Sequence, residues 1–124
     1  MFENKAALLI DDKRETQLTL QYELLCLGFV VTSVSRLDRV EETLQSMYSV
    51  DVIFLGLDMP SSNGYDVLKK LKDSGIDAPI IAHTVHVDDL LRIREAGLQG
   101  LLAKPLDIEC FPDILQEIVA GKQS

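Results

Sequence analysis

Short runs of apolar residues with almost no polar interruption are what most constrain the fold of this chain. The clearest run is 52–57 (VIFLGL), and 6–10 (AALLI) is a second. A strand that is apolar at every position is buried on both faces, because successive side chains point to opposite sides of a sheet. Such strands are typical of parallel sheets that carry helices on each side. These runs therefore predict an α/β fold.

Segments with helical spacing alternate with the apolar runs five times. Five βα units of this kind predict a doubly wound α/β domain with the flavodoxin-like strand order 2-1-3-4-5. The length fits one domain over residues 1–124. Strands are expected at 6–10, 29–34, 52–57, within 76–83 and at 101–103, and helices at 16–27, from 35 to about 47, at 64–73, at 88–96 and after 107.

Several residues are expected to set the ends and faces of the helices. Gly28 is a helix stop, and Ser35 with Asp38 three residues later resembles a helix start. Asp107 is expected to cap the last helix, and Pro112 is tolerated because it falls in the first turn. Apolar residues with helical spacing occur at Leu18, Tyr22 and Leu25 in the first helix, with Leu20, Leu24 and Leu27 beside them. Ile108, Phe111, Leu115 and Ile118 lie on one stripe of the last helix.

Charge and cysteine content exclude several classes of protein. The formal net charge of -8 argues against a nucleic-acid partner, which needs clustered Lys and Arg, and against an anionic membrane surface. Cys26 and Cys110 are far apart and form no metal-spaced motif, so reduced thiols are expected. No apolar run is long enough for a signal peptide or a membrane span. A cytoplasmic protein is therefore expected.

Polar residues follow the predicted strands at their carboxyl ends, where open α/β sheets place their sites. Asp11 and Asp12 directly follow the first strand. Two adjacent carboxylates repel each other, and Mg²⁺ would relieve that repulsion. A cap before the first helix is the alternative reading of this pair. The same rule selects Asp11, Asp12, Gly56, Asp58, Thr84 and Lys104 as candidate site residues.

In combination, these motifs resemble the receiver domain of response regulators in two-component signalling, which has the CheY-like form of the flavodoxin-like fold. The resemblance rests on the acidic pair, the segment 51–64 (DVIFLGLDMPSSNG), Thr84 and Lys104-Pro105, and covers about 6–119. Gly56 falls at the position of the phosphate-accepting aspartate. A glycine has no carboxylate and cannot form an acyl phosphate. Pro60 and Gly64 are expected to shape the loop after the third strand, with Gly64 permitting a backbone conformation or a close approach that a side chain would block.

The resemblance also implies roles for the other site residues. In the family, a hydroxyl at the position of Thr84 donates a hydrogen bond to the phosphoryl group. A lysine at the position of Lys104 pairs with that group and with the acidic cluster, and its bond to the following proline, here Pro105, is usually cis. We therefore expect Lys104 to point at Asp12 or Asp11. Leu101 departs from the family, because many receivers carry a Tyr or Phe there that rotates inward on activation.

These features predict an atypical receiver in a two-component or phosphorelay pathway that works as a protein-interaction module and is not an enzyme. The expected partner is a histidine kinase, an output domain or another receiver, and a homodimer is a further option. The usual contact surface would be the fourth helix, the fifth strand and the last helix. Leu90, Leu91 and Ile93 cannot all face the core, so one of them is a candidate exposed anchor.

Two alternatives use the carboxylates directly. Asp58 could be a displaced phosphoacceptor, although the chain is leaving the strand at that point, which argues against its reach. A divalent-cation-responsive module is the other, with Asp11 and Asp12 holding Mg²⁺ weakly because one carboxylate is missing. Lys104 could instead fill the vacancy as a built-in cation. His83 and His86 lack a third nitrogen or thiolate ligand, so zinc is not expected, and His83 is expected to be partly buried.

Overall fold

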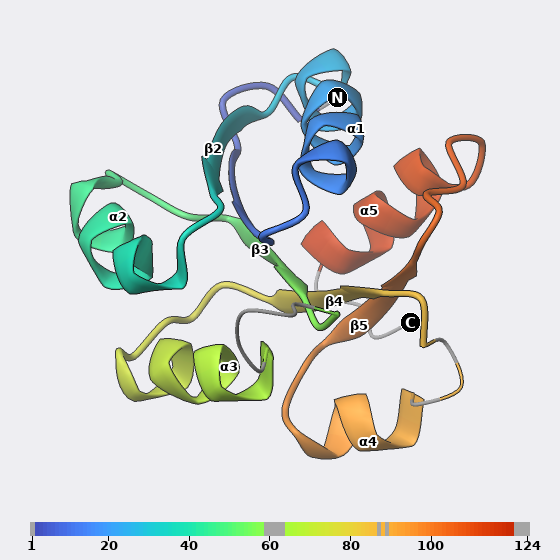
Figure 1. Ribbon diagram of the computed structural model, residues 1–124. Coiled ribbons are helices and arrows are strands. Elements are labelled where there is room, and N and C mark those ends of the chain that lie inside the picture. Colours follow the sequence, from blue (N-terminus) through green and yellow to red (C-terminus); the bar gives the residue numbers. More distant parts are fainter. Residues whose placement is uncertain (1, 59–63, 87, 89, 121–124) are drawn as a thin grey trace.

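The computed structural model describes residues 2–58, 64–86, 88 and 90–120, and its centre is a parallel sheet of five strands (Figure 1). The strand order is β2-β1-β3-β4-β5, which confirms the flavodoxin-like topology predicted from the sequence. Each strand pairs in parallel with its neighbours. The strands are β1 (Ala6–Ile10), β2 (Val30–Val34), β3 (Val52–Gly56), β4 (Ile80–Thr84) and β5 (Gly100–Ala103).

Helices cover both faces of the sheet, as Figure 1 shows. One face carries α1 (Arg14–Cys26) and α5 (Phe111–Val119). The other carries α2 (Val40–Ser46), α3 (Gly64–Asp73) and α4 (Leu90–Glu95), with a short 3-10 turn, η1 (Leu37–Arg39), leading into α2. None of the helices among the described residues is long and apolar enough to cross a membrane.

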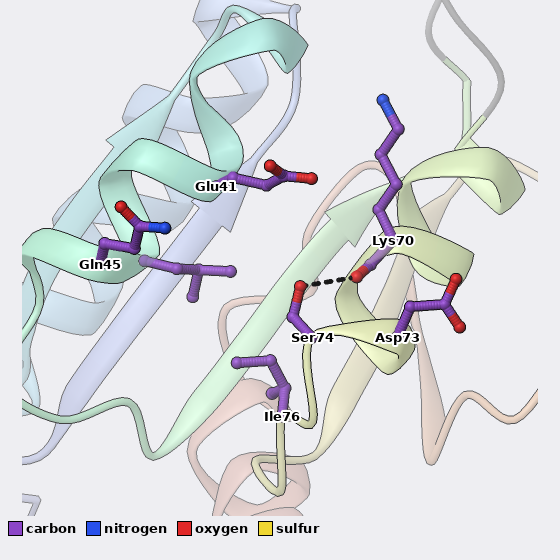
Figure 2. Close-up of a pocket in the computed structure, with 7 residues that line it drawn as sticks. Glu41, Gln45, Lys70, Asp73, Ser74 and Ile76 are labelled. Carbon is purple, nitrogen blue, oxygen red and sulfur yellow. Dashed lines mark hydrogen bonds between the residues drawn. The ribbon is translucent and has the colours of Figure 1, made fainter.

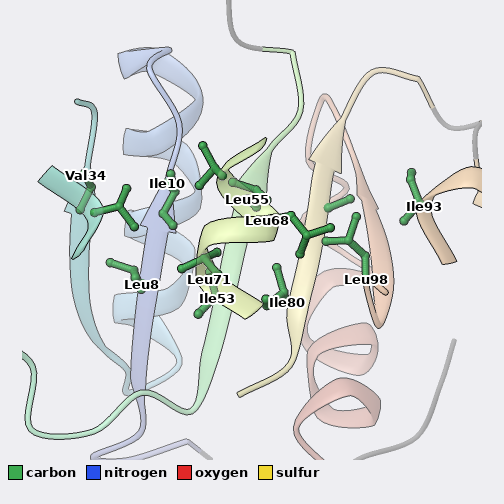
Figure 3. Packing of buried hydrophobic residues seen from close by; sticks show 13 residues of the cluster. Leu8, Ile10, Val34, Ile53, Leu55, Leu68, Leu71, Ile80, Ile93 and Leu98 are labelled. Carbon is green, nitrogen blue, oxygen red and sulfur yellow. The ribbon is translucent and has the colours of Figure 1, made fainter. Parts of the chain in front are cut away.

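The sheet separates two apolar cores. Alternate side chains of one strand enter different cores, so that Leu8 and Ile10 of β1 face α2, α3 and α4, whereas Ala7 and Leu9 face α1 and α5. Figure 3 shows the first core, where Leu68 and Leu71 of α3 pack on β1, β3 and β4. Every residue of β1, β3 and β4 is buried, which is the pattern that their apolar runs predict.

β2 and α1 each present an exposed face. β2 is an edge strand and is mostly exposed or half-buried, because only β1 pairs with it and α1 covers it partly. In α1 the buried residues are Gln17, Leu20 and Leu24, whereas Leu18, Tyr22 and Leu25 are exposed and mark the solvent side of that helix.

Helix ends agree with the sequence in part. Gly28 has φ +101°, the left-handed conformation expected of a helix stop. Ser35 does not cap a helix, since η1 follows Arg36, which makes no side-chain cap bond. The Asp107 side chain accepts hydrogen bonds from the N–H groups of Glu109 and Cys110, in the turn before α5, and its carbonyl oxygen accepts one from the N–H of Phe111, the first residue of the helix. Ile108 in that turn is 55% exposed and lies off the buried stripe.

Candidate functional site

The carboxyl ends of four strands bring the predicted site residues together. Asp11 follows β1, Gly56 ends β3, Thr84 ends β4 and Lys104 follows β5. Parallel pairing in register places these ends at one edge of the sheet, with Gly56 directly beside His83 of β4. The topology itself therefore assembles the site, as it does in other open α/β sheets.

Lys104 and Asp11 form a buried ion pair at the centre of the site. Lys104 Nζ lies 2.9 Å from Asp11 Oδ2, and the two side chains are 7% and 6% exposed. This confirms the expected direction of Lys104 and selects Asp11 over Asp12. The Lys104-Pro105 peptide bond is cis, also as expected. The second oxygen of Asp11 accepts a hydrogen bond from the N–H of Lys13 at 3.0 Å.

The Asp11 carboxylate occupies the space beside Gly56. A Cβ built on Gly56 would lie 2.5 Å from Asp11 Oδ2 and 2.6 Å from its Cγ. Non-bonded carbon atoms attract at about 3.5–4.0 Å and repel strongly well inside that distance. Any side chain at Gly56 therefore requires the Asp11 carboxylate to move from its present position.

Asp58 lies beside Thr84 and Lys104 in the site, where its position after the third strand places it among the candidates. Its Oδ1 accepts a hydrogen bond from the Thr84 hydroxyl at 2.8 Å, and its Oδ2 accepts one from the Val85 N–H at 3.0 Å. Lys104 Nζ is 3.8 Å from Oδ2, and the ring of His86 is 3.3 Å from Oδ1. The chain turns just after β3 so that this carboxylate points back toward the end of β4.

These contacts keep the Asp58 carboxylate ionised. Burial raises the pKa of Asp58, but the hydrogen bonds from Val85 and Thr84, together with the charges of Lys104 and His86, outweigh burial and leave the pKa below its ordinary value. At neutral pH the site thus contains an anionic Asp58 beside a cationic Lys104.

His83 is the most deeply buried titratable ring next to the site. It is 3% exposed, and so it is more deeply buried than the sequence led us to expect. Its Nε2 makes no hydrogen bond with the described part of the chain. Burial, with a further contribution from Lys104, lowers the pKa of His83 to about 4 against the opposing effect of Asp11 and Asp58. The ring is therefore neutral at pH 7.

The remaining candidates lie around this centre. Asp12 is half-buried beside Asp11, and Leu101 is half-buried and packs on the core next to α3 and α4. A Cβ on Gly64 would lie 2.8 Å from the Gly56 carbonyl oxygen, so the close approach expected at Gly64 is confirmed. Met59 and Pro60 lie outside the described residues.

Sequence reasoning missed three contributors to the site. The N–H groups of Lys13, Val85 and His86 donate to Asp11, Asp58 and the Thr84 hydroxyl respectively. Side-chain patterns carry no signal for backbone donors, but all three residues lie shortly after the carboxyl end of β1 or β4. That position at the carboxyl edge is the signal that could have located them.

A parallel sheet of order 2-1-3-4-5 that gathers an acidic residue, a threonine and a lysine at its carboxyl edge defines a receiver-like signalling domain. The sequence pattern of the response regulator receiver domain matches residues 7–116, and the chain belongs to that family. Receiver domains are in general signalling modules and not enzymes, and this one is a receiver domain of two-component signalling.

Curated relatives include complete regulators and a kinase. The chain is 28% identical over 119 residues to the nitrate/nitrite response regulator protein NarL of Escherichia coli (strain K12), covering 93% of this chain and 55% of that protein. It thus spans about half the length of that relative. Two-component response regulator 24 of Arabidopsis thaliana is 30% identical over 114 residues, with 90% and 82% covered. The osmosensing histidine protein kinase SLN1 of Saccharomyces cerevisiae is 32% identical over 89 residues, with 69% and 7% covered.

Solved structures agree on the fold. The chemotaxis protein CheY4 of Vibrio cholerae superposes with a TM-score of 0.82 at 21% identity, covering 93% of this chain and 98% of that one. A two-component response regulator from Clostridium difficile gives a TM-score of 0.83 at 21% identity, with 94% and 97% covered.

Proposed function

We propose that this receiver signals by protein contact and without phosphorylation of an aspartate at the end of β3. One observation carries the proposal: the acceptor position holds Gly56, while the nearby Asp58 carboxylate already contacts Thr84 and Lys104. Gly56 offers no carboxylate for an acyl phosphate. The catalytic requirement for an in-line carboxylate nucleophile is therefore not met at this position.

Asp58 in this proposal is a built-in substitute for the phosphoryl group. By resemblance to the family, the threonine hydroxyl and the lysine would hold phosphoryl oxygens. Here the Thr84 hydroxyl and the Val85 N–H donate to the two Asp58 oxygens, and Lys104 adds a charge contact at 3.8 Å. Hydrogen bonds to an ionised acceptor are roughly twice as strong as neutral ones. Thr84 is thus held toward the pocket by the chain itself.

The partner surface that we propose is the α4, β5 and α5 face. Of the three apolar residues in α4, Ile93 is fully buried and Leu90 is half-buried, whereas Leu91 is 72% exposed. Val85, just before α4, is 52% exposed. An exposed leucine offers apolar surface that a partner can remove from water. A histidine kinase, an output domain or another receiver would supply the contact, in the cytoplasm, and a second copy of the chain is included among these.

Divalent cations have a reduced role in this proposal. Both oxygens of Asp11 and both of Asp58 already accept bonds from donors of the chain, and the Lys104 ammonium lies between the two carboxylates. Among the described residues no group of three His, Cys, Asp or Glu side chains has a metal-binding arrangement. We therefore expect Mg²⁺ to bind Asp11 and Asp12 weakly, since Lys104 supplies the positive charge that a cation would supply.

A second candidate function is phosphorylation of Asp58. The observation that favours it is the presence of an ionised Asp58 carboxylate in the pocket, near Lys104. Its two oxygens are engaged by Thr84, Val85 and His86, however, which lowers their nucleophilicity toward a phosphorus atom. The proposal of a contact module accordingly takes precedence.

Intact-mass measurement after incubation with acetyl phosphate and Mg²⁺ tests both candidates. We expect no phosphate on the native chain, and phosphate on Gly56→Asp once the Asp11 carboxylate has moved aside. The same variant should bind Mg²⁺ more tightly than the native chain, because it restores a carboxylate near Asp12. Phosphate on the native chain that disappears in Asp58→Asn would overturn the proposal in favour of the second candidate.

A further inference from the structure

We propose that a groove between α2 and α3 docks a segment of a partner protein in which apolar side chains are flanked by lysine or arginine. Two adjoining hollows form this groove, of about 550 Å³ and about 260 Å³. They share the lining residues Glu41, Leu44, Lys70 and Ser74, so they are parts of one depression. The larger hollow alone falls within the range of about 300–1,000 Å³ that is typical of binding pockets.

The groove lies between a short α2 and a longer α3. The seven residues of α2 face the ten of α3, and the 3-10 turn η1 replaces the first turn that a longer helix would have. Figure 2 shows the result, with Glu41 and Gln45 on α2 and Lys70, Asp73 and Ser74 on the opposite wall.

Apolar side chains form the floor of the groove. Val67 and Leu71 of α3 belong to the core of that face, and Leu37, Leu44 and Ile76 are half-buried and pack on it. Covering half-buried apolar groups of this kind removes apolar surface from water and so favours association. The floor therefore favours an apolar side chain as the anchor of the occupant.

Unpaired carboxylates set the charge that the occupant must carry. Glu41 extends from α2 toward α3, and the Lys70 ammonium extends away from Ile76 (Figure 2). Within the described part of the chain neither Glu41 nor Asp73 has an ion-pair partner, while Asp38 at the rim is paired with Arg36 at 2.8 Å. Complementary charges at an interface suppress wrong partners and speed association. The lining carries three carboxylates, of Asp38, Glu41 and Asp73, against the one ammonium of Lys70, so its charge is net negative and a basic flank is favoured over an acidic one.

A chain segment suits the groove better than a compact ligand does. Two hollows lie side by side between two facing helices. An amphipathic peptide can place successive apolar anchor residues in hollows arranged in this way. The whole chain carries a formal net charge of -8, which adds long-range attraction for a basic partner. This proposal is independent of whether the domain is phosphorylated, since no residue of the groove belongs to the site at the carboxyl edge.

The test selects random dodecapeptides displayed on phage against the full chain, and then measures the best peptides by fluorescence anisotropy. We expect a consensus with a Leu, Ile, Val or Phe anchor next to Lys or Arg. Glu41→Lys should weaken binding about tenfold or more, because it reverses the charge at the groove wall. The matched control Glu117→Lys, an exposed carboxylate on α5, should change affinity less than about twofold.

Further measurements keep the test decisive. If Glu41→Lys fails to fold, Glu41→Gln replaces it as the test variant and should also weaken binding. Raising NaCl from about 50 to about 500 mM should weaken binding as well, because salt screens the charges. An acidic or purely apolar consensus, peptides that bind Glu41→Lys and Glu117→Lys equally, or no selected peptide sensitive to Glu41 would each overturn the proposal. Self-association of the chain that Glu41→Lys abolishes would overturn it in favour of a second copy as occupant.

Discussion

At the scale of single residues, the contact between Gly56 and Asp11 is the feature that most distinguishes this site. Gly56→Ala adds a Cβ 2.5 Å from Asp11 Oδ2 and forces the carboxylate away from Lys104. We expect a loss of about 1–2 kcal/mol in the free energy of unfolding, as in other overpacked sites. In an Asp11→Ala background the clash is absent, and the same change should stabilise by about 0.5–1 kcal/mol, because glycine weakens a strand.

Urea denaturation of the four proteins in this double-mutant cycle measures the coupling between the two positions. A sign reversal between the two backgrounds supports the arrangement described. If Gly56→Ala has the same effect with and without the Asp11 carboxylate, the two groups are not in contact.

At the scale of elements, the sequence predicts β1, β3 and β4 well, because strands that are buried on both faces appear in the sequence as continuous apolar runs. It predicts β2 and the start of α2 less well. β2 contains the same β-branched residues as a buried strand, and only its place at the sheet edge leaves Val30 59% exposed. Contacts between side chains distant in sequence have no periodic signature. The contact of Lys104 with Asp11 is expected from the family resemblance, whereas that of Asp58 with Thr84 is found only in the folded chain.

The short helix α4 allows a matched test of which apolar residues hold the fold. Ile93 is fully buried and Leu91 is 72% exposed two positions earlier. Ile93→Ala should lower the free energy of unfolding by about 2–4 kcal/mol through lost burial and a cavity. Leu91→Ala should change it by less than about 0.5 kcal/mol, as at other exposed sites. Chemical denaturation of both variants measures the difference, and similar losses would mean that α4 presents a different face to the sheet.

At the scale of the whole molecule, stability should depend on pH through His83. The chain has two histidines, and only His83 is buried. Its pKa of about 4 in the folded state lies below the ordinary value of 6.5. Between these values the unfolded chain binds a proton that the folded chain does not, so the free energy of unfolding falls as pH decreases from about 6.5 to about 4. A pKa shift of this size corresponds to a loss in the free energy of unfolding on the order of 3 kcal/mol.

Thermal and urea unfolding from pH 7 to pH 4 measure this dependence. His83→Leu removes the titrating ring, so its stability should fall less than that of the native chain, by about the amount that the linkage gives. The control His86→Gln changes an exposed ring and should keep the native slope. Carboxylates with a lowered pKa, such as Asp58, also lose their contribution to the free energy of unfolding as pH falls. They do so below their ordinary range near 4, which lies under most of the pH range in which His83 acts. A native slope in His83→Leu would therefore show that His83 is accessible to protons in the folded chain.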